Sequence, residues 1–168
     1  GDSLTAGTTR IFQEAPYAPH LQKALSNSSK LKEEFDTKVM HVGFPGWTTG
    51  NLLDHADDVN GLRTILNTSS SSSSPISLVI LLAGTNDLGI GKTSDEISED
   101  VASLHKICFE ANVSNTIAIG IPPSGYQMQN SKPREVANRT NRNIQAFCQS
   151  DPRAIYFPFP FDYDQDDG

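Results

Sequence analysis

The stretch ISLVILLAGTND, residues 76–87, decides the fold class of this chain. Its first seven residues are almost all apolar, which is typical of a strand buried on both faces of a parallel sheet. Gly84 and three polar residues follow, at the carboxyl end of the strand, where open α/β sheets place their functional side chains. We therefore predict a buried strand over residues 76–82 and a functional loop after it.

Helical and strand patterns alternate on both sides of this strand. The predicted helices cover residues 16–26, 48–66 with an interruption at Gly61, 94–108 and 133–149. The second of them can be capped by Thr48 or Thr49, and the third by Ser94 or Asp95. The other predicted strands cover residues 37–42, 116–121 and 154–157. Alternation of this kind indicates an α/β fold with a mostly parallel sheet and right-handed crossovers. The serine tract over residues 69–74 is predicted to be a surface loop.

Length, composition and charge exclude several classes of protein. The chain has 168 residues, enough for one domain with a real core, and its hydrophobic (36%) and charged (20%) fractions are ordinary for a soluble protein. No apolar run approaches the length of a membrane span. The net charge of −7, without clustered Lys and Arg, argues against nucleic-acid binding. These features leave the compartment, cytoplasmic or secreted, and the oligomeric state open.

The two cysteines indicate neither a disulfide framework nor a metal site. Cys108 and Cys148 each lie in a predicted helix beside apolar neighbours, so we predict that both are buried free thiols. No Cys-x-x-Cys or Cys/His spacing typical of zinc occurs in the sequence. We therefore expect no metal and no cofactor.

Three separated motifs carry the chemistry that the sequence suggests. They are Gly1-Asp2-Ser3-Leu4, Gly46-Trp47-Thr48-Thr49 and Gly84-Thr85-Asn86-Asp87, and the last two follow predicted strands. A serine hydroxyl is a poor nucleophile that needs a base and donors for the oxyanion it creates. Glycine lets a backbone N–H approach a substrate, and a side-chain amide is a neutral donor. In this order the three motifs resemble the GDSL-type (SGNH) hydrolase family, over essentially the whole chain.

The resemblance implies a serine esterase or lipase that cleaves carboxylic esters of small molecules through an acyl-serine intermediate. Ser3 would be the nucleophile, and its backbone N–H, the backbone N–H of Gly46 and the side-chain amide of Asn86 would form the oxyanion hole. The family ends in Asp-x-x-His, and Asp167 matches the aspartate that orients the histidine. Asp2 and Asp87 are expected to brace their loops rather than react.

The resemblance also implies a three-layer α/β/α sandwich with a mostly parallel, flavodoxin-like sheet. A family member would have a strand immediately before the nucleophile, and its histidine would fall two positions after Gly168. We therefore expect residues 1–168 to be a single domain truncated at both ends, lacking its first strand, and to be nearly inactive alone. The histidines within the chain do not match the family motif; they are His20, His41, His55 and His105.

Two other interpretations deserve a test. A non-catalytic binding module could keep this fold, although the presence of Ser3, Gly46 and Asn86 together counts against it. Nucleotide binding is suggested by Gly91-Lys92-Thr93, which matches the end of a phosphate-binding loop. That motif needs a glycine where Asn86 stands, so we do not predict a phosphate site.

Overall fold

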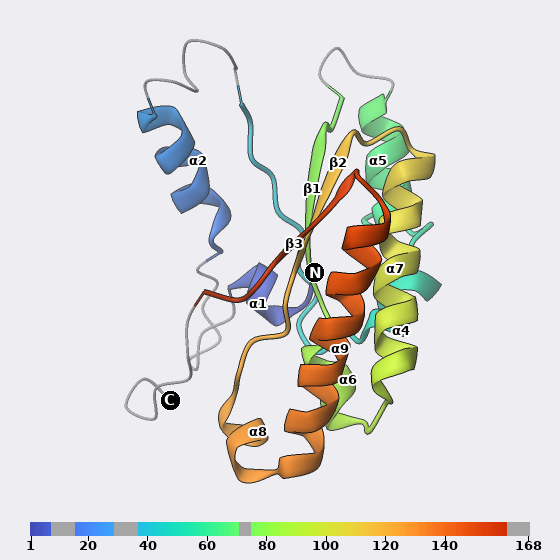
Figure 1. The fold of residues 1–168 in the computed structure, drawn as a ribbon. Coiled ribbons are helices and arrows are strands. Elements are labelled where there is room, and N and C mark those ends of the chain that lie inside the picture. The colour runs from blue at the N-terminus through green and yellow to red at the C-terminus, as the bar shows by residue number, and fades with distance from the viewer. Residues whose placement is uncertain (8–15, 29–36, 71–74, 161–168) are drawn as a thin grey trace. The chain divides into compact units, whose positions relative to one another are not determined.

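The computed structural model describes residues 1–7, 16–28, 37–70 and 75–160. The chain forms two compact units, residues 1–46 and residues 47–168, and each is considered by itself. Strands occur in the second unit, where they form a three-stranded sheet in the order β1-β2-β3 (Figure 1). The strands are β1 (Leu78–Leu82), β2 (Asn115–Ile119) and β3 (Ala154–Phe157).

All strand pairs of this sheet are parallel. Leu78 is paired with Asn115 at the start of β1 and β2, and Thr116 is paired with Ala154 at the start of β3. The predicted α/β class with a parallel sheet is therefore confirmed. Three predicted strands are present: β3 has the predicted bounds, β1 begins two residues later than predicted, and β2 begins one residue earlier and ends two residues earlier. The prediction that β1 is buried on both faces is wrong, because Leu81 and Leu82 are buried but Leu78 is exposed.

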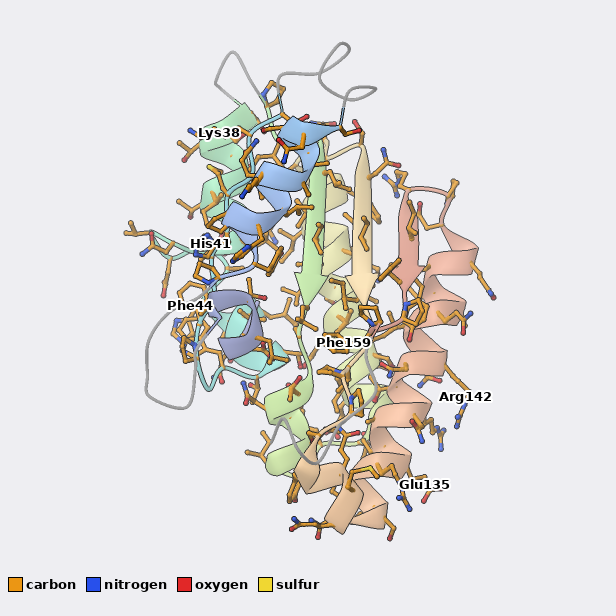
Figure 2. All side chains as sticks on the ribbon, turned by 90° about the vertical axis from the view of Figure 1, so that its left-hand side faces the viewer. Lys38, His41, Phe44, Glu135, Arg142 and Phe159 are labelled. Atoms are coloured by element: carbon orange, nitrogen blue, oxygen red, sulfur yellow. The ribbon has the colours of Figure 1, made fainter. Side chains whose placement is uncertain are left out.

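Helices in the second unit cover one face of the sheet and one end of it. Figure 1 shows α5, α7 and α9 along one side of the sheet, with α6 and α8 at the carboxyl ends of the strands. Figure 2 looks onto the opposite face, with Glu135 and Arg142 marking the exposed side of α9. The helices are α4 (Thr49–Asp54), α5 (Leu62–Ser70), α6 (Thr85–Gly89), α7 (Ser94–Glu110), α8 (Gly125–Gln129) and α9 (Ser131–Ser150).

The core of the second unit lies between α7, α9 and the sheet. Apolar residues at helical spacing on α7 and α9 meet the small inward residues of β2 and β3, which let the helices approach closely. One cluster of buried residues consists of Val101, Ala118, Ile144, Cys148 and Ala154. Both cysteines are buried free thiols, as predicted.

Side-chain capping explains where α4 and α7 begin. Thr48 caps α4 through a capping box with Asn51, as the sequence suggests. For α7 the predicted cap, Ser94 or Asp95, is wrong, because Thr93 forms the capping box with Glu96 and Ser94 is the first helical residue. The two hydroxyls differ because only Thr93 has the extended backbone that an N-cap requires.

The predicted interruption between α4 and α5 at Gly61 is confirmed. A Cβ on Gly61 would lie 2.2 Å from the carbonyl oxygen of His55 and 2.3 Å from that of Ala56. The chain can fold back onto the end of α4 only because this residue has no side chain.

The described part of the first unit contains two helices and an extended segment. The helices are α1 (Ser3–Ala6) and α2 (Ala18–Asn27), of which α2 matches the predicted helix near Pro16. The predicted strand over residues 37–42 is wrong: residues 37–44, marked in Figure 2 by Lys38, His41 and Phe44, are extended but form no strand. The described hydrogen bonds of this segment explain the difference, because its backbone pairs with Gly1 and with a side chain rather than with a ladder of residues.

Two pairs of hydrogen bonds hold this extended segment. The Gln22 side chain donates to the Thr37 carbonyl (2.8 Å) and accepts from the Val39 N–H (2.7 Å). The amino group of Gly1 donates to the Val42 carbonyl (3.1 Å), and the Gly1 carbonyl accepts from the Phe44 N–H (2.9 Å). The second pair of bonds brackets one residue as in a parallel bridge.

Some predicted features lie outside the described residues. Ser69 and Ser70 of the predicted serine loop end α5, and residues 71–74 are not described. The acidic C-terminal stretch, with Asp167, is not described either. Among the helices within the described ranges, none combines the length and the apolar character needed to cross a bilayer.

Gly84, between β1 and α6, is expected to tolerate no side chain. Its φ of +108° disfavours L residues, and an added Cβ would lie 2.9 Å from Ile121 Cδ1 and 3.0 Å from Ile97 Cγ2. Both contacts are with buried core residues. We expect Gly84→Ala to lower the free energy of unfolding by about 2–5 kcal/mol, the combined cost of backbone strain and overpacking. Urea denaturation measures this change.

A second glycine provides the matched control for that prediction. Gly91 also has a positive φ (+79°), but an added Cβ would meet no atom within 4 Å among the described residues. Gly91→Ala should therefore show the cost of backbone strain alone, about 1–2 kcal/mol. Equal losses in the two variants would show that packing against Ile97 and Ile121 is not the reason for glycine at position 84.

Because His105 is buried, we expect this protein to lose stability in mild acid. His105 is fully buried, with Nδ1 2.6 Å from Thr116 Oγ1 and its ring near Phe109 and Phe147. Burial lowers the pKa of His105 to about 4, from 6.5 in the unfolded chain, and nearby Asp151 opposes this shift. Because the unfolded state binds the proton more readily, this contribution to stability is complete above pH 6.5 and is lost as the pH falls toward 4.

Between pH 6.5 and pH 4, the free energy of unfolding should fall by about 3 kcal/mol because of His105. Urea denaturation at several pH values measures it. His105→Gln keeps a partner for Thr116 but cannot titrate, so its free energy of unfolding should vary less over this interval than that of the wild type. Parallel curves for the two proteins would contradict the assignment.

Candidate active site

The segment that carries Ser3 is fixed by its neighbours in the first unit. Asp2 caps α1, because its carboxylate accepts a hydrogen bond from the Leu4 N–H at 3.0 Å. As the first residue of α1, Ser3 has a backbone N–H that no carbonyl of its own helix can accept. Asp2 therefore holds the turn on which Ser3 lies, which is the bracing role that the sequence suggests for it.

The segment that carries Gly46 packs against α1. At Gly43, an added Cβ would lie 2.3 Å from the Ala6 nitrogen, so the two backbones are in direct contact. Three residues later Gly46 has a φ of +82°, which glycine adopts without strain. Within the described part of its unit, an added Cβ at Gly46 would meet no atom within 4 Å. Ser3 and Gly46 thus lie on two segments that the first unit holds together.

Asn86 lies in the second unit, on α6 directly after β1. Its side-chain Nδ2 donates a hydrogen bond to the Trp47 carbonyl at 2.8 Å. A primary amide has two N–H donors, so this contact fixes the amide plane and leaves a second donor with a defined direction. Asn86 is therefore both oriented and able to donate to a bound group.

Asp87, beside Asn86, is fully buried and binds the start of α4. Its carboxylate accepts from the Thr49 N–H (3.0 Å to Oδ2) and from Thr49 Oγ1 (2.7 Å to Oδ1). Lys92 Nζ lies 3.1 Å from Asp87 Oδ1. Both carboxylate oxygens of Asp87 bind partners within the protein, so Asp87 braces the loop, as the sequence suggests.

Sequence reasoning missed the residues that surround Asp87. Lys92 and Asp100 form an ion pair of 2.8 Å, and Thr49 contacts both carboxylates. These residues are separated in sequence by up to 51 positions and form no local pattern. The one available signal was the Gly-Lys-Thr ending, but Lys92 is bound to two carboxylates here, which disfavours a phosphate site.

The two cysteines do not offer an alternative nucleophile. Burial raises the pKa of Cys108 to about 12, and burial together with Asp151 raises that of Cys148 to about 11. Both thiols therefore stay protonated at neutral pH.

His55 is the histidine whose surroundings most resemble a catalytic dyad. His55 Nδ1 lies 2.8 Å from Asp58 Oδ2, and the ring is 4.9 Å from that of Trp47. Both side chains of this pair are well exposed, at 47% and 66%. His105, by contrast, lies in the core and is unsuited to proton transfer to a substrate.

A groove of about 580 Å³ lies at the carboxyl end of the sheet, next to α6. Its walls come from the loop after Asp87 and from α8 and the start of α9. Apolar side chains and polar ones share its lining, among them Leu88, Ile90, Tyr126, Val136, Asn130 and Lys132.

The predicted site residues are therefore distributed over the two units. Ser3 and Gly46 belong to the first unit and Asn86 to the second, while Asp167 is outside the described residues. The described donors are of the kinds that stabilise an oxyanion: backbone N–H groups and an oriented amide.

Comparison with solved structures identifies the fold. The crystal structure of AlinE4, an SGNH-hydrolase family esterase, has a TM-score of 0.66 at 17% identity, covering 93% of this chain and 71% of that chain. The psychrotrophic esterase EstA from Pseudoalteromonas sp., inhibited by monoethylphosphonate, has a TM-score of 0.65 at 17% identity, covering 95% and 74%. The acetyl xylan esterase AlAXEase has a TM-score of 0.62 at 16% identity, covering 94% and 74%. The fold is thus that of the SGNH hydrolases.

A model of the GDSL-like lipase/acylhydrolase family matches residues 1–168. The chain therefore belongs to this family. No curated protein sequence matches it significantly.

Proposed function

We propose that the protein hydrolyses carboxylic esters through an acyl intermediate on Ser3. The observation that carries this proposal is the orientation of Asn86, whose amide is fixed by the Trp47 carbonyl with one donor left over. The family match over residues 1–168 supports the same reaction. Ser3 and Gly46, on segments packed together in the first unit, supply the other donors.

In the first step of this mechanism, Ser3 Oγ attacks the ester carbonyl carbon and gives its proton to a histidine. The carbonyl oxygen becomes an oxyanion, which accepts hydrogen bonds from the Ser3 N–H, the Gly46 N–H and Asn86 Nδ2. The C–O bond to the alcohol then breaks, and the histidine donates its proton to the leaving alkoxide. Water, deprotonated by the same histidine, cleaves the acyl-serine and releases the acid.

The general base in this proposal is the histidine of the family motif, two positions after Gly168, with Asp167 orienting it. Activity is therefore to be measured on the full-length natural protein. The His55–Asp58 pair is the alternative base within the chain, because its Nδ1 contact has the geometry of a catalytic dyad. His55→Ala should keep its activity if the motif histidine is the base, and should lose it otherwise.

We propose that the groove beside α6 binds the part of the ester that does not react. Its lining combines apolar side chains with amides and Tyr126, which suits either an acyl chain or a sugar ring. A screen of aryl esters of increasing acyl length, together with sugar acetates, would identify which of the two the groove accepts.

Covalent labelling tests the proposed nucleophile without a natural substrate. The full-length protein is treated with an alkyl fluorophosphonate, which phosphonylates an activated serine and releases fluoride. Peptide mass spectrometry should find the adduct on Ser3 and none after heat denaturation. Labelling at another serine, or none in the native protein, would refute the assignment of Ser3.

A further inference from the structure

Two adjacent residues of α6 hold two nearby residues at the start of α4. Asn86 donates to the Trp47 carbonyl, and Asp87 accepts from the N–H and the hydroxyl of Thr49. Trp47 and Thr49 flank Thr48, the N-cap of α4. The direction of the Asn86 amide therefore depends on where α4 begins, which depends in turn on Asp87.

The hydroxyl group of Thr49 cannot satisfy both carboxylates that it contacts, because it has a single proton. The Thr49 hydroxyl lies 2.7 Å from Asp87 Oδ1 and 2.8 Å from Asp100 Oδ2, yet it has one proton to donate. Without a further donor, two carboxylates would face each other across a single hydroxyl group. Like charges placed so close favour protonation or separation of one carboxyl.

Lys92 supplies the missing donors. Its Nζ lies 2.8 Å from Asp100 Oδ2, 3.1 Å from Asp87 Oδ1 and 3.4 Å from Thr49 Oγ1. The Lys92 backbone N–H also donates to the Asp87 carbonyl at 3.2 Å, which returns the loop to α6. An added Cβ on Gly50 would lie 3.1 Å from Lys92 Nζ, so the first turn of α4 leaves room for the ammonium group.

We propose that Lys92 is a positioning residue for the oxyanion donor Asn86. Its ammonium group neutralises the Asp87–Asp100 pair, which keeps Asp87 on Thr49 and keeps the Trp47 carbonyl where it orients the Asn86 amide. This inference rests on the function proposed above.

The charges around Lys92 keep it protonated. Burial by itself lowers the pKa of Lys92, but its hydrogen bonds to Asp100 and Asp87 and the charges of both carboxylates outweigh burial and raise it. The side chain is 23% exposed, so solvent screens the pair only in part. Glu96, on the first turn of α7, is the other carboxylate influenced by Lys92 and is held by its capping contact with Thr93.

The test compares Lys92→Met, Lys92→Arg and a matched control, Lys106→Met, which changes an exposed lysine of α7. For a short-chain aryl ester, Lys92→Met should lower kcat by roughly 10- to 100-fold, as expected for a displaced catalytic group, with KM little changed. The loss should grow as the pH rises, because acid protonates one of the two uncompensated carboxyls. Lys92→Arg should recover most of the activity, and Lys106→Met should match the wild type.

A double variant keeps the test decisive if Lys92→Met does not fold. Lys92→Met/Asp100→Asn removes one positive and one negative charge together, so it should fold and regain activity with the pH profile of the wild type. A folded double variant whose activity is low at every pH would overturn the proposal. So would a folded Lys92→Met protein with the kcat and pH profile of the wild type.

A spectroscopic measurement separates this inference from the proposed function. The Asn86 side-chain NH₂ signal in ¹⁵N-labelled protein reports its hydrogen bond to Trp47 independently of turnover. Its protection from solvent exchange should fall in Lys92→Met and return in Lys92→Arg. Unchanged protection refutes the role of Lys92, whereas full activity of Ser3→Ala would refute the proposed acyl-serine mechanism and leave this measurement to judge the positioning.

Discussion

Ser3→Ala is expected to lower kcat for a short-chain aryl ester by about 10⁶-fold, the scale of loss when the nucleophile of a serine hydrolase is removed. Without Oγ no acyl intermediate can form, and what remains is binding and the oxyanion donors acting on water. The backbone N–H of residue 3 stays in place, as does the cap of α1 by Asp2. The variant should therefore fold normally and bind substrate with a similar KM.

Initial rates of the purified full-length protein, with product release followed over hours, measure this loss. Ser103→Ala is a suitable control, because it removes a serine hydroxyl that bonds within α7, to the Glu99 carbonyl. That variant should retain full activity. A Ser3→Ala protein that still turns over at the wild-type rate would remove the basis of the proposed mechanism.

Asn86→Ala should lower kcat by about 10²–10³-fold, with a small change in KM. The amide is fixed at 2.8 Å from the Trp47 carbonyl, so its second donor is already directed when the oxyanion forms. A donor that needs no reorganisation stabilises the transition state more than the ground state, which is why the effect belongs to kcat.

Asn86→Asp separates this role from a structural one. The carboxylate has nearly the same shape as the amide but offers no donor, and it would face both the Trp47 carbonyl and the developing negative charge. We expect activity at or below that of Asn86→Ala. Asn138→Ala, which removes an exposed amide from α9, serves as the control. Activity of Asn86→Ala within a few-fold of the control would exclude Asn86 from the oxyanion hole.

Long periodic elements of this fold are predictable from the sequence because the spacing of their apolar residues indicates which face is buried. The helical spacing of Ile97, Val101 and Leu104 specifies which face of α7 meets the core. The apolar run of β1 predicts that strand but not its burial, because only Leu81 and Leu82 are buried. Short elements have too few residues to show such spacing. The helices α1, α6 and α8 contain four or five residues, too few for a period of 3.6 to be visible.

The extended segment over residues 37–44 shows a second limit of prediction. Its composition is that of a strand, but composition cannot reveal which groups its backbone will pair with. Here the partners are Gly1 and the Gln22 side chain, both distant in sequence. Pairing, rather than propensity, decides whether such a segment becomes a strand.

The candidate site divides in the same way. Ser3, Gly46 and Asn86 can be proposed from the sequence because their motifs are contiguous and match a family pattern. The residues that hold Asp87 could not be proposed from the sequence, because Thr49, Lys92 and Asp100 come from three different parts of the chain. Only the folded chain shows that one ammonium group serves two carboxylates.

Lys92 takes part in two features of the molecule: it lines the groove beside α6, and it binds Asp87 and Asp100. Under the proposed function, shortening this side chain to admit bulkier esters would also loosen the support of Asn86. Substrate breadth and turnover are therefore expected to be coupled at this position. Tyr126 and Val136, on the far wall of the same groove, are the safer places to begin redesign.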